Sequence, residues 1–209
     1  MKGLILKDLY MSIKYFKSYI FILFLFLVVS IYDPENLFYM IYPCIICSII
    51  PVNLLAYDER SHWDIYCGAL PVTRDMVVSA KYLISLSFQG AIFLITAVTQ
   101  AIRIAMAGSF DLESYQVLLS LLCIVSLFSS SISLPFMFKL GVEKGRLAYY
   151  VMIGVICGGS ALSTMAFRNG MQANIPFGSV LLLGCVLAAA TFAGSWYLSI
   201  IFYRKRELH

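Results

Sequence analysis

The sequence predicts an all-α, polytopic membrane protein in which six transmembrane helices follow an amphipathic interfacial helix, with both termini in the cytoplasm. Hydrophobic residues make up 61% of the chain and charged residues 12%, whereas soluble domains are about half apolar and about a quarter charged. Apolar runs close to the ~20 residues that cross a bilayer recur along the whole length. Basic residues gather at alternate ends of these runs, and this pattern sets the orientation. Residues 1–209 are therefore expected to form one transmembrane domain.

The first element is predicted to be an interfacial helix over residues 1–17. At ~100° per residue, five apolar side chains fall within about a 100° arc, and Lys7 and Lys14 lie nearly opposite them. Such a helix lies on the membrane rather than crossing it. A charged start without a small-residue cleavage site is not typical of a signal peptide. The five apolar residues are Ile5, Leu6, Leu9, Ile13 and Phe16.

Six apolar runs are predicted to span the bilayer. Their bounds are Ser18–Tyr32, Leu37–Ala56, Met76–Ala107, Tyr115–Phe138, Tyr149–Phe167 and Pro176–Tyr203. With the N-terminus inside, 13 of the 15 Lys and Arg residues lie on the inner side, and only Arg103 and Arg168 lie outside. Cytoplasmic loops carry the excess of basic residues, so the predicted orientation follows. Because these residues are spread over the ends of spans, the net charge of +4 does not indicate nucleic-acid binding.

A polar stretch over residues 57–75 separates the second and third predicted spans. Its charged, aromatic and proline residues suit a short helix that docks into a groove on a partner. Acidic residues would open that helix, and Pro71 would end it. A loop whose aromatic rings sit at the lipid headgroups is the alternative, and the residues alone leave both open. The candidate docking residues are Asp58, Glu59, Arg60, Trp63, Asp64, Tyr66, Pro71 and Arg74.

A second cytoplasmic loop follows the fourth predicted span and is the other surface on which a partner could dock. An ordinary basic loop that only sets the topology is equally compatible with its charges. Its candidate residues are Lys139, Glu143, Lys144 and Arg146.

Four polar residues of the third predicted span lie at i, i+7, i+11 and i+14, which places them on one stripe within ~60°. Polar residues inside a membrane face a bundle interior or a cavity. They either line a transport path or form hydrogen bonds between helices. The four residues are Gln89, Thr96, Gln100 and Arg103.

Two further patterns concern helix packing. Gly184-x-x-x-Ala188 in the sixth span permits close approach of another helix, and packing within one subunit is preferred over a dimer seam. Pro135 removes a backbone hydrogen bond from the fourth span, and the serines before it can partly replace that bond. A hinge and a static kink both fit.

No catalytic or metal-binding pattern is found. His62 and His209 are the only histidines, and neither falls in a Ser-His-Asp or zinc-ligand spacing. The sequence therefore predicts a protein that is not an enzyme.

Several motifs resemble those of the ABC-2 type permeases, most closely the small branch that includes the phenol-soluble-modulin exporter permeases. The polar stretch and the start of the third span match in Asp58-Glu59-Arg60-Ser61-x-Trp63-Asp64, Leu70-Pro71-Val72-Thr73-Arg74 and Val78-x-x-Lys81-Tyr82-Leu83. The end of the fourth span matches in Ser133-Leu134-Pro135-Phe136 and Phe138-Lys139-x-Gly141-x-Glu143-Lys144-x-Arg146. The opening helix matches in Leu6-Lys7-Asp8-Leu9. Long outer loops of the larger lipid exporters are absent.

This resemblance implies that the polar stretch is a coupling helix that passes motion from an ATPase to the membrane helices. The chain lacks the G-x-x-x-x-G-K-[ST] phosphate loop, so ATP and Mg would bind a separate ABC ATPase subunit and this chain would hold no cofactor. ABC-2 permeases pair, which implies a second permease subunit, either a second copy or a related chain.

The sequence thus predicts the membrane subunit of an ABC exporter in the bacterial cytoplasmic membrane. Short outer loops and aromatic-rich spans favour a hydrophobic or amphipathic substrate, with short amphipathic peptides as the first hypothesis. The alternative is a non-transporting immunity or sensor protein of the membrane.

Overall fold

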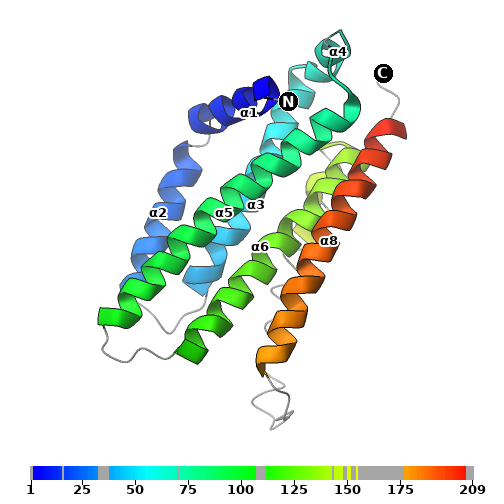
Figure 1. Ribbon diagram of the computed structural model, residues 1–209. Coiled ribbons are helices and arrows are strands. Elements are labelled where there is room, and N and C mark those ends of the chain that lie inside the picture. Colours follow the sequence, from blue (N-terminus) through cyan, green and yellow to red (C-terminus); the bar gives the residue numbers. More distant parts are fainter. Residues whose placement is uncertain are drawn as a thin grey trace.

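The computed structural model describes residues 2–15, 17–32, 38–69, 71–106, 112–142, 144–147, 150–151, 154 and 177–205. All regular elements in this part of the chain are helices, as Figure 1 shows. The helices are α1 Lys2–Tyr15, α2 Lys17–Tyr32, α3 Phe38–Arg60, α4 Trp63–Gly68, α5 Arg74–Met106, α6 Leu112–Leu140 and α8 Phe177–Lys205. The all-α prediction is confirmed for the described residues.

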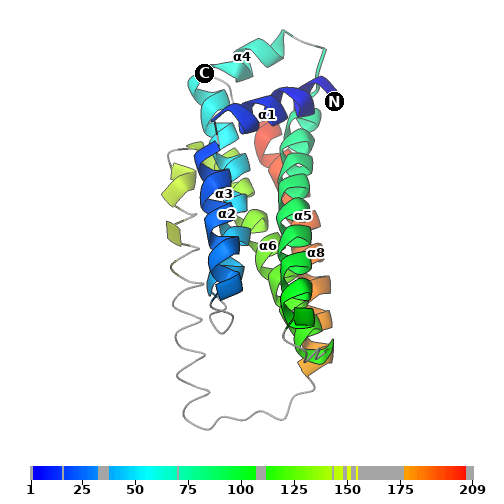
Figure 2. The same ribbon diagram turned by 90° about the vertical axis from the view of Figure 1, so that its left-hand side faces the viewer.

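The long helices run side by side as a bundle, and α1 lies across one end of it (Figures 1 and 2). The axes of α1 and α2 meet at 70°. The short helix α4 lies at the same end of the bundle, which we call the α4 end, and both chain ends are found there (Figures 1 and 2). This arrangement is compatible with two cytoplasmic termini, although the orientation relative to a membrane stays a prediction.

In the described part of the chain, four helices are long and apolar enough to cross a membrane, or five if the bent pair α1 and α2 counts as one span. The four segments are Ile41–Arg60, Arg74–Ile102, Tyr115–Leu140 and Leu181–Lys205, and they match the second, third, fourth and sixth predicted spans. The first predicted span qualifies only together with α1. Nearly all of Tyr149–Phe167 lies outside the described residues, so the total of six spans stays a prediction.

The end of α3 differs from the sequence prediction. Asp58, Glu59 and Arg60 were expected to open a separate short helix, but they form the last turn of α3. No glycine or proline interrupts the helix there, and a basic Arg60 in the last turn interacts favourably with the helix dipole. The helix ends before His62, whose φ of 51° is left-handed.

The amphipathic pattern of α1 has two faces in the structure. Leu6, Leu9 and Ile13 are exposed on the outer face, where lipid could cover them. The opposite face buries Leu4 and Asp8 against the bundle. Leu6, Leu9 and Ile13 of the predicted arc therefore point away from the protein, whereas Ile5 of the same arc packs against the core and Asp8 points into it.

Close packing joins α6 to α8. A Cβ atom at Gly184 would lie 2.7 Å from Cδ1 of Ile124, so a larger residue at this position would displace the end of the Ile124 side chain. Ala188, one turn further along α8, is 2% exposed. The Gly184-x-x-x-Ala188 pattern thus serves packing within one subunit, as small residues do between membrane helices.

Pro135 lies inside α6 and leaves the carbonyl of Ser131, four residues earlier, without its usual donor. The hydroxyl of Ser195 on α8 donates to that carbonyl at 2.6 Å. A serine does replace the missing bond, as expected, but it comes from another helix. The proline therefore creates a point of attachment between α6 and α8.

Candidate functional site

The α4 helix is held at the end of the bundle by a tight turn. Ser61 N–H donates to the Tyr57 carbonyl at 3.0 Å, and His62 N–H donates to the Glu59 carbonyl at 3.3 Å. The left-handed backbone of His62 then reverses the chain into Trp63, the first residue of α4. Six residues are too few to form a stable helix alone, so α4 depends on what it packs against.

The inner face of α4 is anchored and its outer face is open. Cys67 is buried with Leu4 of α1 and with Val77 and Ala80 of α5, and burial raises the pKa of the Cys67 thiol. Tyr66, by contrast, is 72% exposed. A large exposed aromatic side chain on an anchored helix is typical of residues that form the centre of a protein interface.

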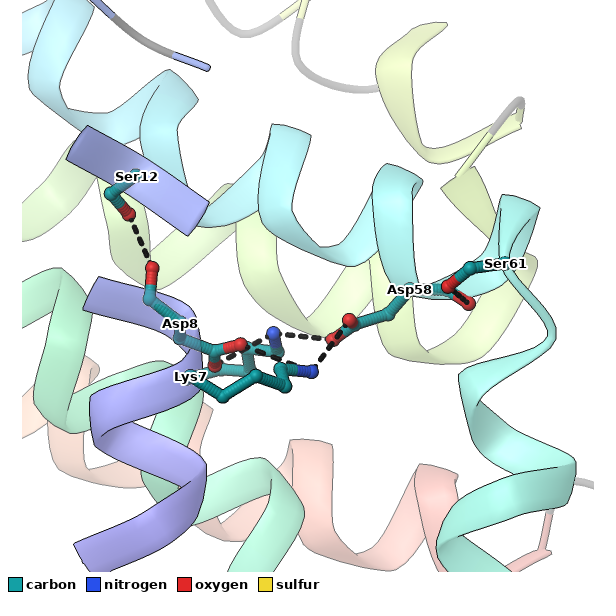
Figure 3. A network of polar contacts seen from close by, with 6 residues as sticks. Lys7, Asp8, Ser12, Asp58 and Ser61 are labelled. Atoms are coloured by element: carbon teal, nitrogen blue, oxygen red, sulfur yellow. Dashed lines mark hydrogen bonds and ion pairs between the residues drawn. The ribbon is translucent and has the colours of Figure 1, made fainter. Parts of the chain in front are cut away.

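Four charged residues meet beneath α4, and we call them the charge network: Lys7, Asp8, Asp58 and Lys81. The ammonium of Lys81 lies 2.8 Å from Oδ2 of Asp8 and 2.5 Å from Oδ2 of Asp58. Lys7 donates to Oδ1 of Asp58 at 2.7 Å and lies 3.2 Å from Oδ1 of Asp8. Figure 3 shows the carboxylates of Asp8 and Asp58 facing one another across the two ammonium groups.

The charge network is electrically balanced and mostly dry. It holds two positive and two negative side chains, and those of Lys81 and Asp8 are each 2% exposed. Burying a charge costs several kcal/mol unless an opposite charge compensates it, about 3–5 kcal/mol when one partner of a buried pair is lost. All four charges are therefore needed together, and they tie α1, α3 and α5 to one another.

The charge network also reaches α4. The ammonium of Lys7 lies 4.0 Å from the centroid of the Trp63 ring, a cation–π contact worth about 0.5–2 kcal/mol. Trp63 is half-buried and packs with the same cluster as Cys67. A displacement of α4 would consequently act on Lys7 and, through it, on three helices.

The predicted docking residues of the polar stretch take different places. Asp58 is buried in the charge network, and Glu59 accepts the backbone N–H of Val142 at 2.9 Å. Arg74 donates to the Arg204 carbonyl at 3.0 Å, and Pro71 is exposed. The side chain of Asp64 lies outside what the structure describes. Among the predicted docking residues whose burial the structure describes, Asp58 is buried and Trp63 is half-buried, and the others are exposed.

The second predicted surface joins the first. Lys144 and Arg146 line one cavity together with Glu59 and Arg60. The structure thus brings residues of both predicted cytoplasmic loops to one place. Lys139 points elsewhere, with its ammonium 5.0 Å from the centroid of the Phe202 ring, and Glu143 lies outside the described residues.

The polar stripe of α5 forms hydrogen bonds between helices. Gln89 donates to the Ser126 carbonyl of α6 at 2.7 Å, and Gln100 donates to Oγ of Ser30 on α2 at 2.8 Å. Thr96 is buried and donates to the Ile92 carbonyl of its own helix at 2.5 Å. The side chain of Arg103 is not described. The amide nitrogens of Gln89 and Gln100 thus bond to neighbouring helices of the same subunit, and a role of the stripe in a transport path stays a prediction.

The sequence reasoning missed the charge network as a unit. Lys7, Asp8 and Lys81 were noted only for topology or resemblance, and Asp58 only for docking. The available signal was Lys81, which lies within the candidate span Arg74–Ile102, because an ionisable residue among apolar neighbours requires a partner. Its partners could not be named, since they come from two distant segments.

In the part of the chain that the structure describes, no group of three or more His, Cys, Asp or Glu residues could hold a metal ion.

The family model described as ABC-2 family transporter protein matches residues 3–204. The chain belongs to the ABC-2 transporter family. Membership indicates a membrane permease subunit of an ABC transporter, a transport component that works in a bilayer with an ABC ATPase and is not itself catalytic. No curated protein and no solved structure matches the chain.

Proposed function

We propose that this ABC-2 protein is the membrane subunit of a bacterial ABC exporter and that its ATPase subunit docks on α4. The observation that carries the proposal is the two-sided character of α4. Tyr66 is 72% exposed, and its ring stacks beside that of Trp63, with ring centroids 6.4 Å apart. Trp63 in turn contacts Lys7 of the charge network. A helix with one free face and one anchored face can pass movement from a partner into the bundle.

The proposed coupling begins with ATP binding on the partner. Closure of two ATPase subunits would displace α4 relative to the bundle. Because Trp63 contacts Lys7, and Lys7 pairs with Asp58, the displacement would reach α1 and the end of α3. Lys81 would carry it into α5. The helices would then move as a group, since separating any one of them breaks a buried ion pair.

The proposed substrate is hydrophobic or amphipathic, with short amphipathic peptides as the first hypothesis. Exposed apolar side chains along the long helices suit a protein that handles molecules from the membrane. A complete exporter would contain a second permease subunit, either another copy of this chain or a related one. Secretion of a peptide and protection of the cell from it would be the same activity.

The test is ATPase activity of the reconstituted transporter with the variants Tyr66→Ala and Tyr10→Ala. Both tyrosines are largely exposed, at 72% and 67%, but Tyr10 lies on α1 outside the proposed docking face. Tyr66→Ala should lower the permease-dependent part of the ATPase rate about tenfold, as loss of a central aromatic contact does. Tyr10→Ala should leave the rate unchanged.

A stronger disruption should follow from Trp63→Ala combined with Tyr66→Ala, because both the docking face and the contact with Lys7 are lost. Unchanged stimulation in this folded double variant would exclude α4 as the docking element.

A further inference from the structure

A cavity of about 830 Å³ opens at the α4 end of the bundle. Its walls come from the junction of α1 and α2, the last two turns of α3, and the segment that follows α6. Cavities that bind small molecules typically measure about 300–1,000 Å³. The charge network lies outside this cavity, because none of its four residues lines it.

Three cations and one carboxylate line the cavity. Arg60, Lys144 and Arg146 are exposed, and none has a carboxylate within ion-pair distance among the residues that the structure describes. Glu59 is the lining carboxylate, and its Oε2 already accepts the Val142 N–H at 2.9 Å. The cavity therefore has a positive potential that favours an anion.

The opposite wall of the cavity is aromatic and neutral. Tyr19 belongs to the first turn of α2, and the amide of Asn53 donates to its hydroxyl at 3.4 Å. Asn53 and Arg60 are both on α3, seven residues apart, which is about 10 Å along a helix. Tyrosines favour the headgroup level of a membrane. The cavity thus passes from cations at the α4 end to tyrosine and amide groups nearer the predicted span.

This gradient matches a molecule with an anionic head and an apolar tail. Two guanidinium groups provide planar forks that bind phosphate oxygens in pairs, and Lys144 adds a point charge. A soluble anion would use only the cationic end, whereas an amphiphile would also contact the tyrosine wall.

We propose that this cavity binds the phosphate headgroup of an anionic membrane amphiphile at the cytoplasmic face. The binding itself depends only on the cavity, while its use as the entry point for an anionic amphipathic substrate rests on the proposed function. Use of the cavity as an entry point would restrict the substrate to molecules that carry negative charge at one end.

The experiment measures binding of three probes to the purified permease in a neutral detergent, with no ATPase present. The probes are dihexanoyl phosphatidylglycerol, dihexanoyl phosphatidylcholine and glycerol phosphate, so that headgroup charge and tail are varied separately. The test variant is Lys144→Gln with Arg146→Gln. The matched control is Lys139→Gln with Lys205→Gln, which removes the same charge from exposed cations outside the cavity.

Phosphatidylglycerol should bind the wild type at least about tenfold more tightly than the other two probes, and the test variant should lose about that factor. The control variant should keep the wild-type affinity. Equal binding of phosphatidylglycerol and phosphatidylcholine, or equal loss in both variants, would overturn the site. Equally tight binding of glycerol phosphate would overturn the amphiphile as its ligand. If phosphatidylglycerol binds as expected but no ATPase accompanies the permease when it is purified from its native cells, the binding site stands and the exporter function is excluded.

Discussion

The two sides of α5 are held by different chemistry. Lys81 and Tyr82 are neighbours in the chain, and both are almost fully buried. Lys81 faces α1 and α3, and its ammonium pairs with the carboxylates of Asp8 and Asp58. The hydroxyl of Tyr82 faces α8, where it lies 2.7 Å from the hydroxyl oxygens of both Ser195 and Ser199.

The neutral side of α5 is held by several contacts that do not depend on one another, whereas the contacts on the charged side do. The Tyr82 ring also stacks on Trp196, with ring centroids 5.5 Å apart, so loss of one hydroxyl leaves the other contacts in place. The charged side requires balance, because removal of any one member leaves an excess charge out of water. We infer that α6 and α8 form a fixed scaffold and that α1, α3, α4 and α5 form the part that responds to a partner.

The largest effect is expected for Lys81→Met, which leaves Asp8 and Asp58 with only Lys7 between them. Loss of one partner of a buried ion pair costs about 3–5 kcal/mol. Thermal unfolding in detergent should therefore show a large fall in the midpoint. Addition of Asp58→Asn restores the charge balance and should recover part of that fall. A double variant with a lower unfolding midpoint than Lys81→Met would show that charge balance does not govern the stability of the charged side of α5.

A moderate effect is expected for Ser195→Ala on the neutral side. The Ser131 carbonyl loses the donor that replaces the proline-blocked bond, while Tyr82 keeps Ser199. Interhelical hydrogen bonds in membrane proteins are worth about 0.6–2 kcal/mol, so the unfolding midpoint should fall by less than with Lys81→Met. Ser87→Ala is the control, because its exposed hydroxyl bonds only within α5. Equal unfolding midpoints for the two serine variants would show that Ser195 does not stabilise the attachment of α8 to α6.

The smallest effect is expected for Arg204→Gln, which removes an ion pair between α8 and Asp75 at the start of α5. Both side chains are substantially exposed, with relative areas of 63% and 38%. Water and salt screen such pairs, and many contribute nothing measurable. The unfolding midpoint should match the wild type in high salt. A fall comparable to that of Ser195→Ala would show that this end of α5 is less hydrated than its exposure indicates.

The sequence predicted the composition-driven features of this molecule better than its long-range pairings. The helical class and most span positions follow from local patterns of apolar residues. The bond at the Ser131 carbonyl shows the limit. Pro135 indicates that a carbonyl loses its donor, but the identity of the donor, Ser195, depends on how α8 packs against α6.

The structure brings residues of the polar stretch and of the second predicted loop together, but docking of a partner there stays a prediction. Local sequence rules placed Asp58, Glu59 and Arg60 at the start of a new helix, because acidic residues favour helix N-termini. In the structure Asp58 is needed by Lys7 and Lys81, and such tertiary partners override local preference.

The most direct measurement is affinity purification of this permease from its native cells in mild detergent, followed by mass spectrometry of the proteins that accompany it. A phosphate-loop ATPase in stoichiometric amount, lost in the Trp63→Ala and Tyr66→Ala double variant, is the predicted result. Recovery of the folded permease without any such ATPase would contradict the exporter function and favour a non-transporting immunity or sensor protein.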